Sequence, residues 1–199
     1  MIENIMTAKK LPVGSSGQHT SGWLGMLALI ATEAALFAYL LFSYFYLATQ
    51  AQTTWLPTAS PSLKLALPNT FILITSSFIL YWGERSIRKG KRSQLLLAIG
   101  LTLALGIVFM AIQVQEWYSK PFSMTDSAYG SMYFTITGFH MLHVLGGVII
   151  LAVVFLWTAL GNFNAERHAP IAISAIYWHF VDIVWLVVFS TFYLYPYLR

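Results

Sequence analysis

The sequence contains no cysteine. That absence excludes disulfide bonds, thiolate nucleophiles, iron–sulfur clusters and cysteine-ligated metals. Charge is scarce as well, because Asp, Glu, Lys and Arg make up only 9% of the residues, whereas soluble domains carry about 25%. The net charge of +4 is too small and too localised for a nucleic-acid partner. It indicates membrane orientation and contact with anionic lipids instead.

Apolar and aromatic residues are abundant, at 58% and 16% of the chain, and the mean hydropathy is +0.68. This composition predicts an integral membrane protein. A spanning helix needs roughly 20 apolar residues, and five segments qualify: 22–48, 67–82, 95–115, 130–160 and 171–197. We therefore predict an all-α membrane protein with five transmembrane helices in one bundle, residues 22–199, after a flexible cytoplasmic tail, residues 1–21. The second segment is the shortest, and we expect it to gain length from 63–66 or 83–87.

The basic residues predict how the chain crosses the bilayer. Eight of the eleven Lys and Arg residues fall in the N-terminal tail or in the loops after the second and fourth spans. The positive-inside rule then places the N-terminus in the cytoplasm and the C-terminus outside. The loop after the second span should also bind anionic lipid headgroups, at about 1 kcal/mol per basic residue. The residues expected to do so are Arg85, Arg88, Lys89, Lys91 and Arg92.

The last span carries an acid and an imidazole in an apolar run. An ionised Asp near the centre of a spanning helix costs about 2.5–3.5 kcal/mol, so Asp182 needs a partner, a proton or a function. Helical spacing puts Trp178, Asp182 and Trp185 on one face, with His179 in reach of Asp182. Two large rings flanking an acid indicate a buried helix–helix contact. We predict that Asp182 hydrogen-bonds to an indole, to His179 or to a neighbouring helix, and that it serves assembly.

Other polar residues also lie within or at the end of the apolar segments. Glu33 lies near the centre of the first span, His140 and His143 lie in the fourth, and Gln113 and Glu116 end the third. We interpret these residues as paired polar groups that tie helices together, with no catalytic residue and no metal. Because no cation lies within one helical turn of Glu33, we expect Glu33 to hold a proton at neutral pH or to share one with a neighbour.

Two alternatives give these residues a chemical role. The spacing of His140 and His143 allows a metal or haem site that includes His179, but the large residues around the pair leave no slot for a haem. A proton or ion pathway through Glu33 or Asp182 is the second alternative, since buried acids mark proton relays. Such a pathway normally needs polar residues along its length, and the first span offers few.

Several strings along the chain resemble subunit III of the haem–copper cytochrome c oxidases. The resemblance covers nearly the whole chain, from about Trp23 to Tyr193. Its most specific part is the string Tyr177–Leu186 in the last span. Further matches are Thr32–Phe37, Gln113–Trp117 with Phe122, Tyr129–Ser131 and Thr137–Val144, and weaker ones are Asn69–Thr70 and Ser76–Ser77.

The resemblance implies a non-catalytic accessory subunit of a respiratory, proton-pumping enzyme complex. Such a subunit binds the side of the catalytic subunit I, with subunit II in the same complex, and has no haem or copper of its own. Glu33 takes the place of the family's carbodiimide-sensitive carboxylate. The family is thought to support proton uptake into subunit I and to prolong its catalytic lifetime, and its members hold phospholipids between their helices.

One departure and several alternatives accompany this resemblance. Longer family members have seven helices, and this chain starts where their third begins, so the two-helix arm that forms half of the lipid cleft would be missing. We expect a multi-pass protein of the plasma (inner) membrane of a prokaryote, in a complex that passes electrons from cytochrome c to oxygen. The alternatives are a quinol oxidase, a nitric-oxide-reductase-type complex and an independent proton or small-solute transporter. Inverted repeats and broken midplane helices, which often mark transporters, are not evident in the sequence.

Overall fold

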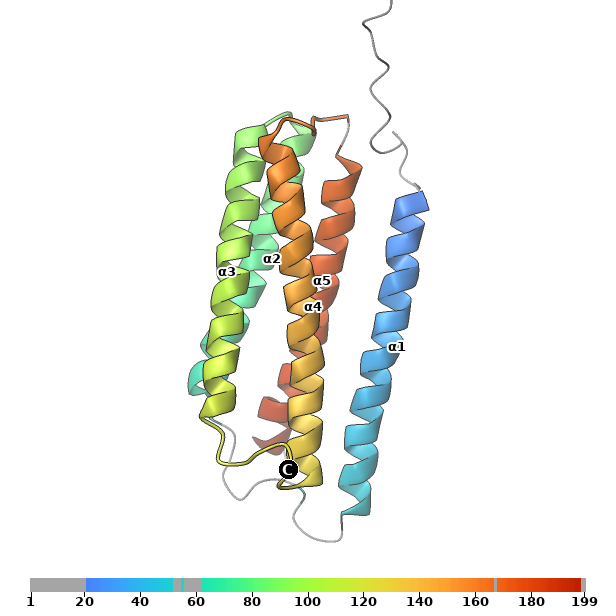
Figure 1. The fold of residues 1–199 in the computed structure, drawn as a ribbon, viewed down its shortest axis with the longest axis vertical. Helices are drawn as coiled ribbons and strands as arrows, with labels where there is room; N and C mark the ends of the chain where they lie inside the picture. The colour runs from blue at the N-terminus through green and yellow to red at the C-terminus, as the bar shows by residue number, and fades with distance from the viewer. Residues whose placement is uncertain (1–20, 52–54, 56–61, 167, 198–199) are drawn as a thin grey trace, which may run out of the picture.

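The computed structural model describes residues 21–51, 55, 62–166 and 168–197, and these residues are helical apart from short connections (Figure 1). The flexible tail predicted for residues 1–21 lies outside the described residues except for Ser21, which begins the first helix. A π-helical turn and a 3₁₀ turn follow the fifth α-helix. The elements are α1 (Ser21–Gln50), α2 (Leu63–Arg88), α3 (Arg92–Tyr118), α4 (Ala128–Ala159), α5 (Ala169–Phe189), η1 (Ser190–Leu194) and η2 (Tyr195–Tyr197).

All five α-helices are long and apolar enough to cross a membrane, which confirms the predicted all-α, five-span fold. The second span differs most from its prediction, because α2 extends at both ends to 26 residues. Ser62 caps its start by accepting a hydrogen bond from the Lys64 backbone N–H at 3.3 Å. At the other end, Arg85 and Arg88 occupy the last turn, where cations interact favourably with the free carbonyl groups. The helix therefore continues beyond the apolar stretch that predicted it.

The helices alternate in direction, so that the α2–α3 and α4–α5 connections lie at one end of the bundle, together with the start of α1 (Figure 1). We call this end the basic end, because it carries Arg85, Arg88, Lys89, Lys91 and Arg92. The antiparallel helices α4 and α5 pack against each other, and α2 packs against α3 and α5. The predicted sidedness stays a prediction, since the remaining basic residues that support it lie outside the described residues.

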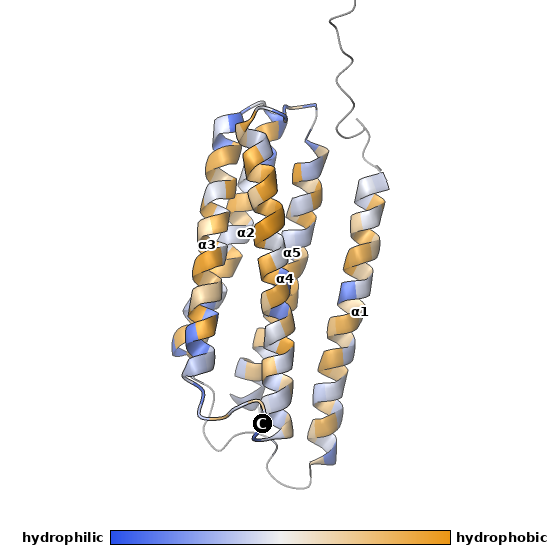
Figure 2. Ribbon diagram, in the orientation of Figure 1, coloured by the Kyte–Doolittle hydropathy of each residue, from blue (hydrophilic) through white to orange (hydrophobic). Residues whose placement is uncertain are grey.

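Helix α1 stands at the edge of the bundle, where it packs mainly against α4 and α5 (Figure 1). The helices are largely apolar along their length, with more polar residues toward the two ends of the bundle (Figure 2). Large exposed side chains such as Phe42 and Phe78, at 66% and 69% exposure, occur on different helices. Such exposed apolar side chains are typical of a protein that is surrounded by the lipid bilayer.

The centre of the bundle is built around Trp178, which is fully buried. Its ring lies against Gly106 of α3 and Gly147 of α4, where a Cβ would approach the indole to 2.8 Å at either position. Glycine at these two positions lets α3 and α4 approach the indole on α5 closely, as small residues commonly do in membrane helix packing. The same packing fixes the orientation of α5 and thus the position of its polar residues.

Candidate functional site

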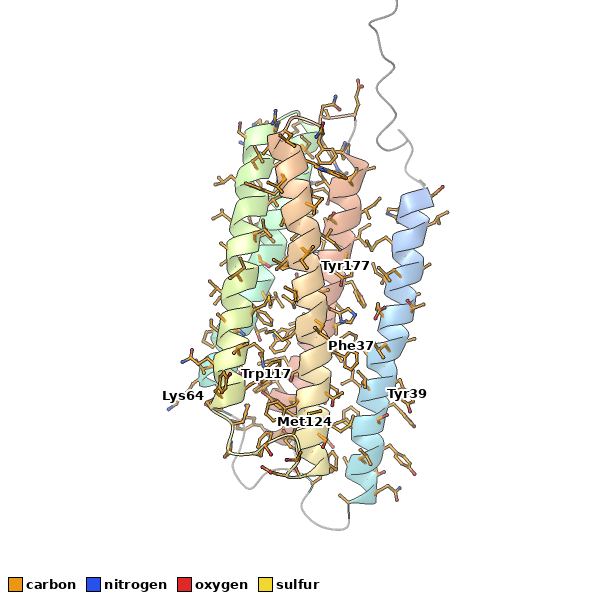
Figure 3. The ribbon with its side chains drawn as sticks, in the orientation of Figure 1. Phe37, Tyr39, Lys64, Trp117, Met124 and Tyr177 are labelled. Atoms are coloured by element: carbon orange, nitrogen blue, oxygen red, sulfur yellow. The ribbon has the colours of Figure 1, made fainter. Side chains whose placement is uncertain are left out.

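The inward face of α1 places Glu33 against the rest of the bundle. The least exposed positions of this helix recur at steps of three and four: Met26, Ile30, Glu33, Phe37, Leu40 and Tyr44. Figure 3 shows Phe37 pointing from α1 toward α4 and α5, whereas Tyr39 points away from the bundle. Glu33 lies one helical turn before Phe37 on this face.

Glu33 is hydrogen-bonded to His143 of α4, across the contact between α1 and α4. Its Oε2 lies 2.9 Å from His143 Nε2, and the two side chains are 26% and 14% exposed. The other ring nitrogen, Nδ1, lies 2.7 Å from the Phe139 carbonyl oxygen. A carbonyl oxygen can only accept, so Nδ1 carries a hydrogen. The Glu33–His143 bond therefore contains one proton, which sits on the carboxyl group or on the imidazole.

This arrangement explains how an acid is tolerated at this depth. A neutral carboxyl beside a neutral imidazole, and a carboxylate beside an imidazolium, both have a net charge of zero. A net-neutral, hydrogen-bonded pair avoids the uncompensated charge that is costly in a membrane. The hydrogen-bond partner that α1 lacks is thus supplied by α4, and His143 is the neighbour with which Glu33 can share its proton.

His140 and His143 have different environments although they are one turn apart. His140 is fully buried, and its ring stacks on Trp185 at 4.9 Å between centroids, with Phe109 edge-on at 5.9 Å. Neither of its ring nitrogens has a hydrogen-bond partner. His143 faces α1, and Phe37 packs edge-on against it at 5.0 Å. His140 is therefore a packing residue of the bundle interior, and His143 is a hydrogen-bonding residue at its edge.

The tryptophans predicted to flank Asp182 bond to α2 instead. Trp178 Nε1 donates to Ser76 Oγ, and Trp185 Nε1 donates to Thr70 Oγ1, both over 3.0 Å. The indole partner predicted for Asp182 is therefore not observed. Trp178, Asp182 and Trp185 do lie on one face of α5, but hydroxyl groups of α2 accept the hydrogen bonds of both indole N–H groups.

His179 is also not bonded to Asp182. Its Nδ1 lies 2.6 Å from the Ser77 hydroxyl of α2. Asp182 is only 6% exposed, and neither carboxyl oxygen has a partner with ordinary hydrogen-bond geometry. Ser77 lies close enough to act on the Asp182 carboxyl group, but the bond of ordinary geometry that its hydroxyl makes with a side chain is the one with His179. Asp182 is thus a buried acid without a hydrogen bond of ordinary geometry among the described residues.

The three imidazoles considered for a metal site are separated by these contacts. His140 stacks on Trp185, His143 bonds to Glu33, and His179 bonds to Ser77. Within the described parts of the chain, no three His, Asp or Glu side chains come together in a way that could hold a metal ion. These side chains therefore serve contacts between helices.

Gln113 and Glu116 lie inside the bundle near the end opposite the basic end. Glu116 Oε1 accepts hydrogen bonds from Lys120 Nζ at 2.9 Å and from the Tyr193 hydroxyl at 2.6 Å. The Tyr193 hydroxyl also lies 2.9 Å from that of Tyr133, and the Lys120 ammonium lies over both rings at about 5 Å. Gln113 is fully buried beside this cluster. Lys120, which lies just after α3, is thus an interior partner of Glu116.

The guanidinium of Arg92 caps another helix, and the lipid-headgroup role predicted for Arg92 stays a prediction. Nε donates to the Thr158 carbonyl oxygen over 2.7 Å, and Nη2 donates to that of Ala159. These carbonyl groups end α4 and lack partners within their own helix. Arg92 therefore ties the start of α3 to the end of α4.

The other basic residues remain at the surface of the basic end. Arg85 lies over the Tyr81 ring at 5.4 Å, and Arg88 pairs with Glu84. Both arginines are exposed and keep donors free for lipid phosphate groups. The two residues between α2 and α3 that are likewise exposed are Lys89 and Lys91.

The hydroxyl residues that receive the tryptophan indoles were missed as site residues. Thr70, Ser76 and Thr137 accept hydrogen bonds from Trp185, Trp178 and Trp117. Thr70 and Ser76 lie six residues apart in a short apolar span, and Trp178 and Trp185 lie seven apart in another. These similar spacings of hydrogen-bond acceptors and donors could have indicated that the residues pair. Only the fold shows, however, that the two spans are neighbours.

The fold and these contacts define a multi-span helical membrane protein whose buried polar groups join its helices. The model of the family described as cytochrome c oxidase subunit III matches residues 14–197. The chain belongs to this family, and hence to cytochrome c oxidase, an enzyme complex of the respiratory chain.

Individual relatives agree with this family. The chain is 37% identical to "Cytochrome c oxidase subunit 3" of Danio rerio over 177 residues, which cover 85% of this chain and 67% of the relative. The protein of the same name from Oncorhynchus clarkii is 38% identical over the same coverage. That of Petromyzon marinus is 37% identical over 190 residues, 89% of this chain and 72% of the relative.

These relatives correct the predicted location. Danio rerio, Cyprinus carpio and Petromyzon marinus are animals. Their proteins point to the inner mitochondrial membrane and contradict the plasma membrane of a prokaryote that the sequence analysis predicted. The prediction was wrong because hydropathy and basic loops show that a chain spans a membrane and which side is basic, but not which membrane it spans.

Proposed function

We propose that the chain is a non-catalytic accessory subunit that binds subunit I of the oxidase, stabilises it and supports its proton uptake while electrons pass from cytochrome c to oxygen. The observation that carries this proposal is the Glu33–His143 bond between α1 and α4, in a chain of the subunit III family. The pair provides an intramembrane group that holds one proton at partial exposure.

The proposed proton role rests on the geometry of this pair. Moving the shared proton between Glu33 Oε2 and His143 Nε2, 2.9 Å apart, changes neither the net charge nor the packing. Loss of this proton to an acceptor outside the pair would leave a net charge of −1, so the pair can pass a proton on at low electrostatic cost only when another proton replaces it. Tyr177 supports this arrangement, because its hydroxyl donates to the His143 carbonyl oxygen at 3.2 Å.

The non-catalytic part of the proposal is supported by how the imidazoles are used. Both ring nitrogens of His143 are hydrogen-bonded, and the ring of His140 is enclosed by Phe37, Phe109 and Trp185. A redox metal bound here would have to displace these contacts. Haem and copper would therefore belong to partner subunits, and subunit I would be the direct neighbour.

Lipid binding is the second element of the proposal. Arg85, Arg88, Lys89 and Lys91 are exposed at the basic end, where anionic phospholipid headgroups would lie. Basic residues near a membrane surface attract such lipids by about 1 kcal/mol each. The transporter alternative gains no comparable support, because α1 to α4 are each continuous and the fifth span, Ala169–Tyr197, departs from α-helix only after Phe189, whereas transporter sites are often formed by helices broken near the midplane.

Purification of a tagged chain from its native membrane tests the proposal. We expect haem-containing subunits of the oxidase to copurify with the chain, and the chain stripped of these partners to show no stoichiometric haem absorbance or copper. Purified complexes with and without the chain should then differ in the number of turnovers before inactivation. A chain that purifies without haem-containing partners, or that holds its own haem, would contradict the proposal.

A further inference from the structure

A groove of about 410 Å³ runs between α2 and α5 on the side of the molecule that Asp182 approaches. Its polar residues are Ser77, His179 and Asp182. The other residues that line it are Ile74, Phe78, Tyr81 and Ile183, of which Phe78 and Ile183 are 69% and 61% exposed. The groove is therefore open to the membrane and combines an apolar wall with a polar base.

Among the described residues, no donor makes a hydrogen bond of ordinary geometry to the acid at the base of this groove. Asp182 is more than nine-tenths buried, and neither carboxyl oxygen has a partner with ordinary geometry. Ser77 is engaged by His179, and the indoles of Trp178 and Trp185 are engaged by α2. A buried acceptor without a donor costs free energy in a medium without water. An occupant of the groove that brings a donor would remove this cost.

The depth of the groove decides between two classes of occupant. Ser77 lies near the middle of the 26-residue helix α2, so Asp182 faces the central part of the hydrocarbon core. A phospholipid carries its polar groups near the surfaces of this core, about 15 Å from the midplane. Acyl chains would cover Phe78 and Ile183 but would bring no donor to Asp182. A membrane helix can place a hydroxyl, amide, indole or basic side chain at any depth.

We propose that the groove between α2 and α5 is a docking site for a transmembrane helix of another oxidase subunit, which donates a side-chain hydrogen bond to Asp182. Phe78 and Ile183 then pack on either side of this helix, and Asp182 fixes its position along the groove. The proposal rests on the proposed function only in taking the partner to be a subunit of the oxidase.

Site-specific photocrosslinking in native membranes, before any detergent is added, tests the contact. Benzoylphenylalanine at position 78 and at position 183 should each crosslink to the same transmembrane helix of another subunit, identified by its peptides. Position 42 on α1 is the matched control, because Phe42 is 66% exposed on a different helix. It should not reach that partner helix. Adducts only with lipid, or only with a second copy of this chain, would overturn the proposal.

Substitutions then test the hydrogen bond and the fit separately. Asp182→Asn keeps an acceptor, so the amount of chain retained in the complex should stay close to wild type. Asp182→Leu should weaken retention about three- to twentyfold, the range that corresponds to interhelical hydrogen bonds in membranes. Equal retention of the Asn and Leu variants would overturn the role of Asp182.

A second pair of variants removes folding as an explanation. Ile183→Trp enlarges an exposed residue at the groove, and Ile149→Trp makes the same change at a 56% exposed position of α4. We expect only Ile183→Trp to reduce retention. If haem-containing subunits copurify but positions 78 and 183 give no crosslinks, the docking site would be contradicted and the proposed function would not. Crosslinks to one helix of a protein outside the oxidase would contradict both the proposed function and the proposal that the docked helix belongs to an oxidase subunit.

Discussion

Trp185 on α5 donates its indole N–H to Thr70 Oγ1 on α2 over 3.0 Å, although the two residues are 115 positions apart. About two turns earlier on α5, Trp178 makes the same kind of bond to Ser76 of α2. The partners occur in opposite order along α2 and α5, as they must for antiparallel helices. These two bonds therefore set the register of α2 against α5.

Thr70→Val tests the contribution of this register bond. Valine keeps the shape of threonine but leaves the buried Trp185 N–H without an acceptor, which costs about 1–3 kcal/mol. The free energy of unfolding, measured by denaturant titration in mixed micelles, should fall by this amount. Thr75→Val is the matched control, because Thr75 is exposed and bonds only to the Phe71 carbonyl of its own helix. Equal losses for the two variants would contradict the interhelical role.

Gly147→Ala tests the close approach of α4 to Trp178. The new Cβ would lie 2.8 Å from the buried indole, and overpacking of this kind costs about 1–3 kcal/mol. Gly138→Ala on the same helix meets no atom within 4 Å, so it should be neutral or stabilise by up to about 1 kcal/mol. The same unfolding measurement compares the two, and a smaller loss for Gly147 than for Gly138 would refute the packing described here.

Lys120→Met tests the buried cluster around Glu116. The side chains of Lys120 and Glu116 are only 10% and 3% exposed, and removing one partner of a buried ion pair costs about 3–5 kcal/mol. Glu116→Gln in the Lys120→Met background should restore part of the loss, since it removes the unpaired acid. Lys64→Met is the control on an exposed lysine of α2. Similar losses for the two lysines would argue against an interior ion pair.

Labelling with a hydrophobic carbodiimide tests the shared proton of Glu33. Carbodiimides react with protonated acids in apolar surroundings, and the Glu33–His143 bond holds one proton at the edge of the bundle. We expect mass spectrometry to find Glu33 modified in preference to Glu84, which pairs with Arg88, and to Glu116, which pairs with Lys120. Glu33→Gln should abolish the main adduct. Labelling of Glu84 or Glu166 alone would show that Glu33 is not the protonated acid.

The pattern of apolar and polar residues was enough to predict the class of fold and to single out most of the buried polar residues. Apolar segments of membrane-spanning length, separated by turn residues, predict five helices, because backbone groups in lipid must be satisfied within the helix. Glu33, Glu116 and Asp182 could be singled out for the same reason, since an acid in an apolar run is costly and needs an explanation. Helical periodicity also placed Trp178, Asp182 and Trp185 on one face.

Which of these side chains contact one another could be seen only in the folded protein. The partner of Glu33 is on α4, those of Trp178 and Trp185 are on α2, and Arg92 reaches the end of α4. Hydropathy is similar on all sides of a helix in lipid, so it does not reveal which face meets which neighbour. Contacts between helices depend instead on close packing at small residues such as Gly106 and Gly147 and on hydrogen bonds between distant parts of the chain. For this reason the sequence left an indole, His179 and a neighbouring helix open as partners of Asp182, and only the folded protein places this acid at a groove between α2 and α5.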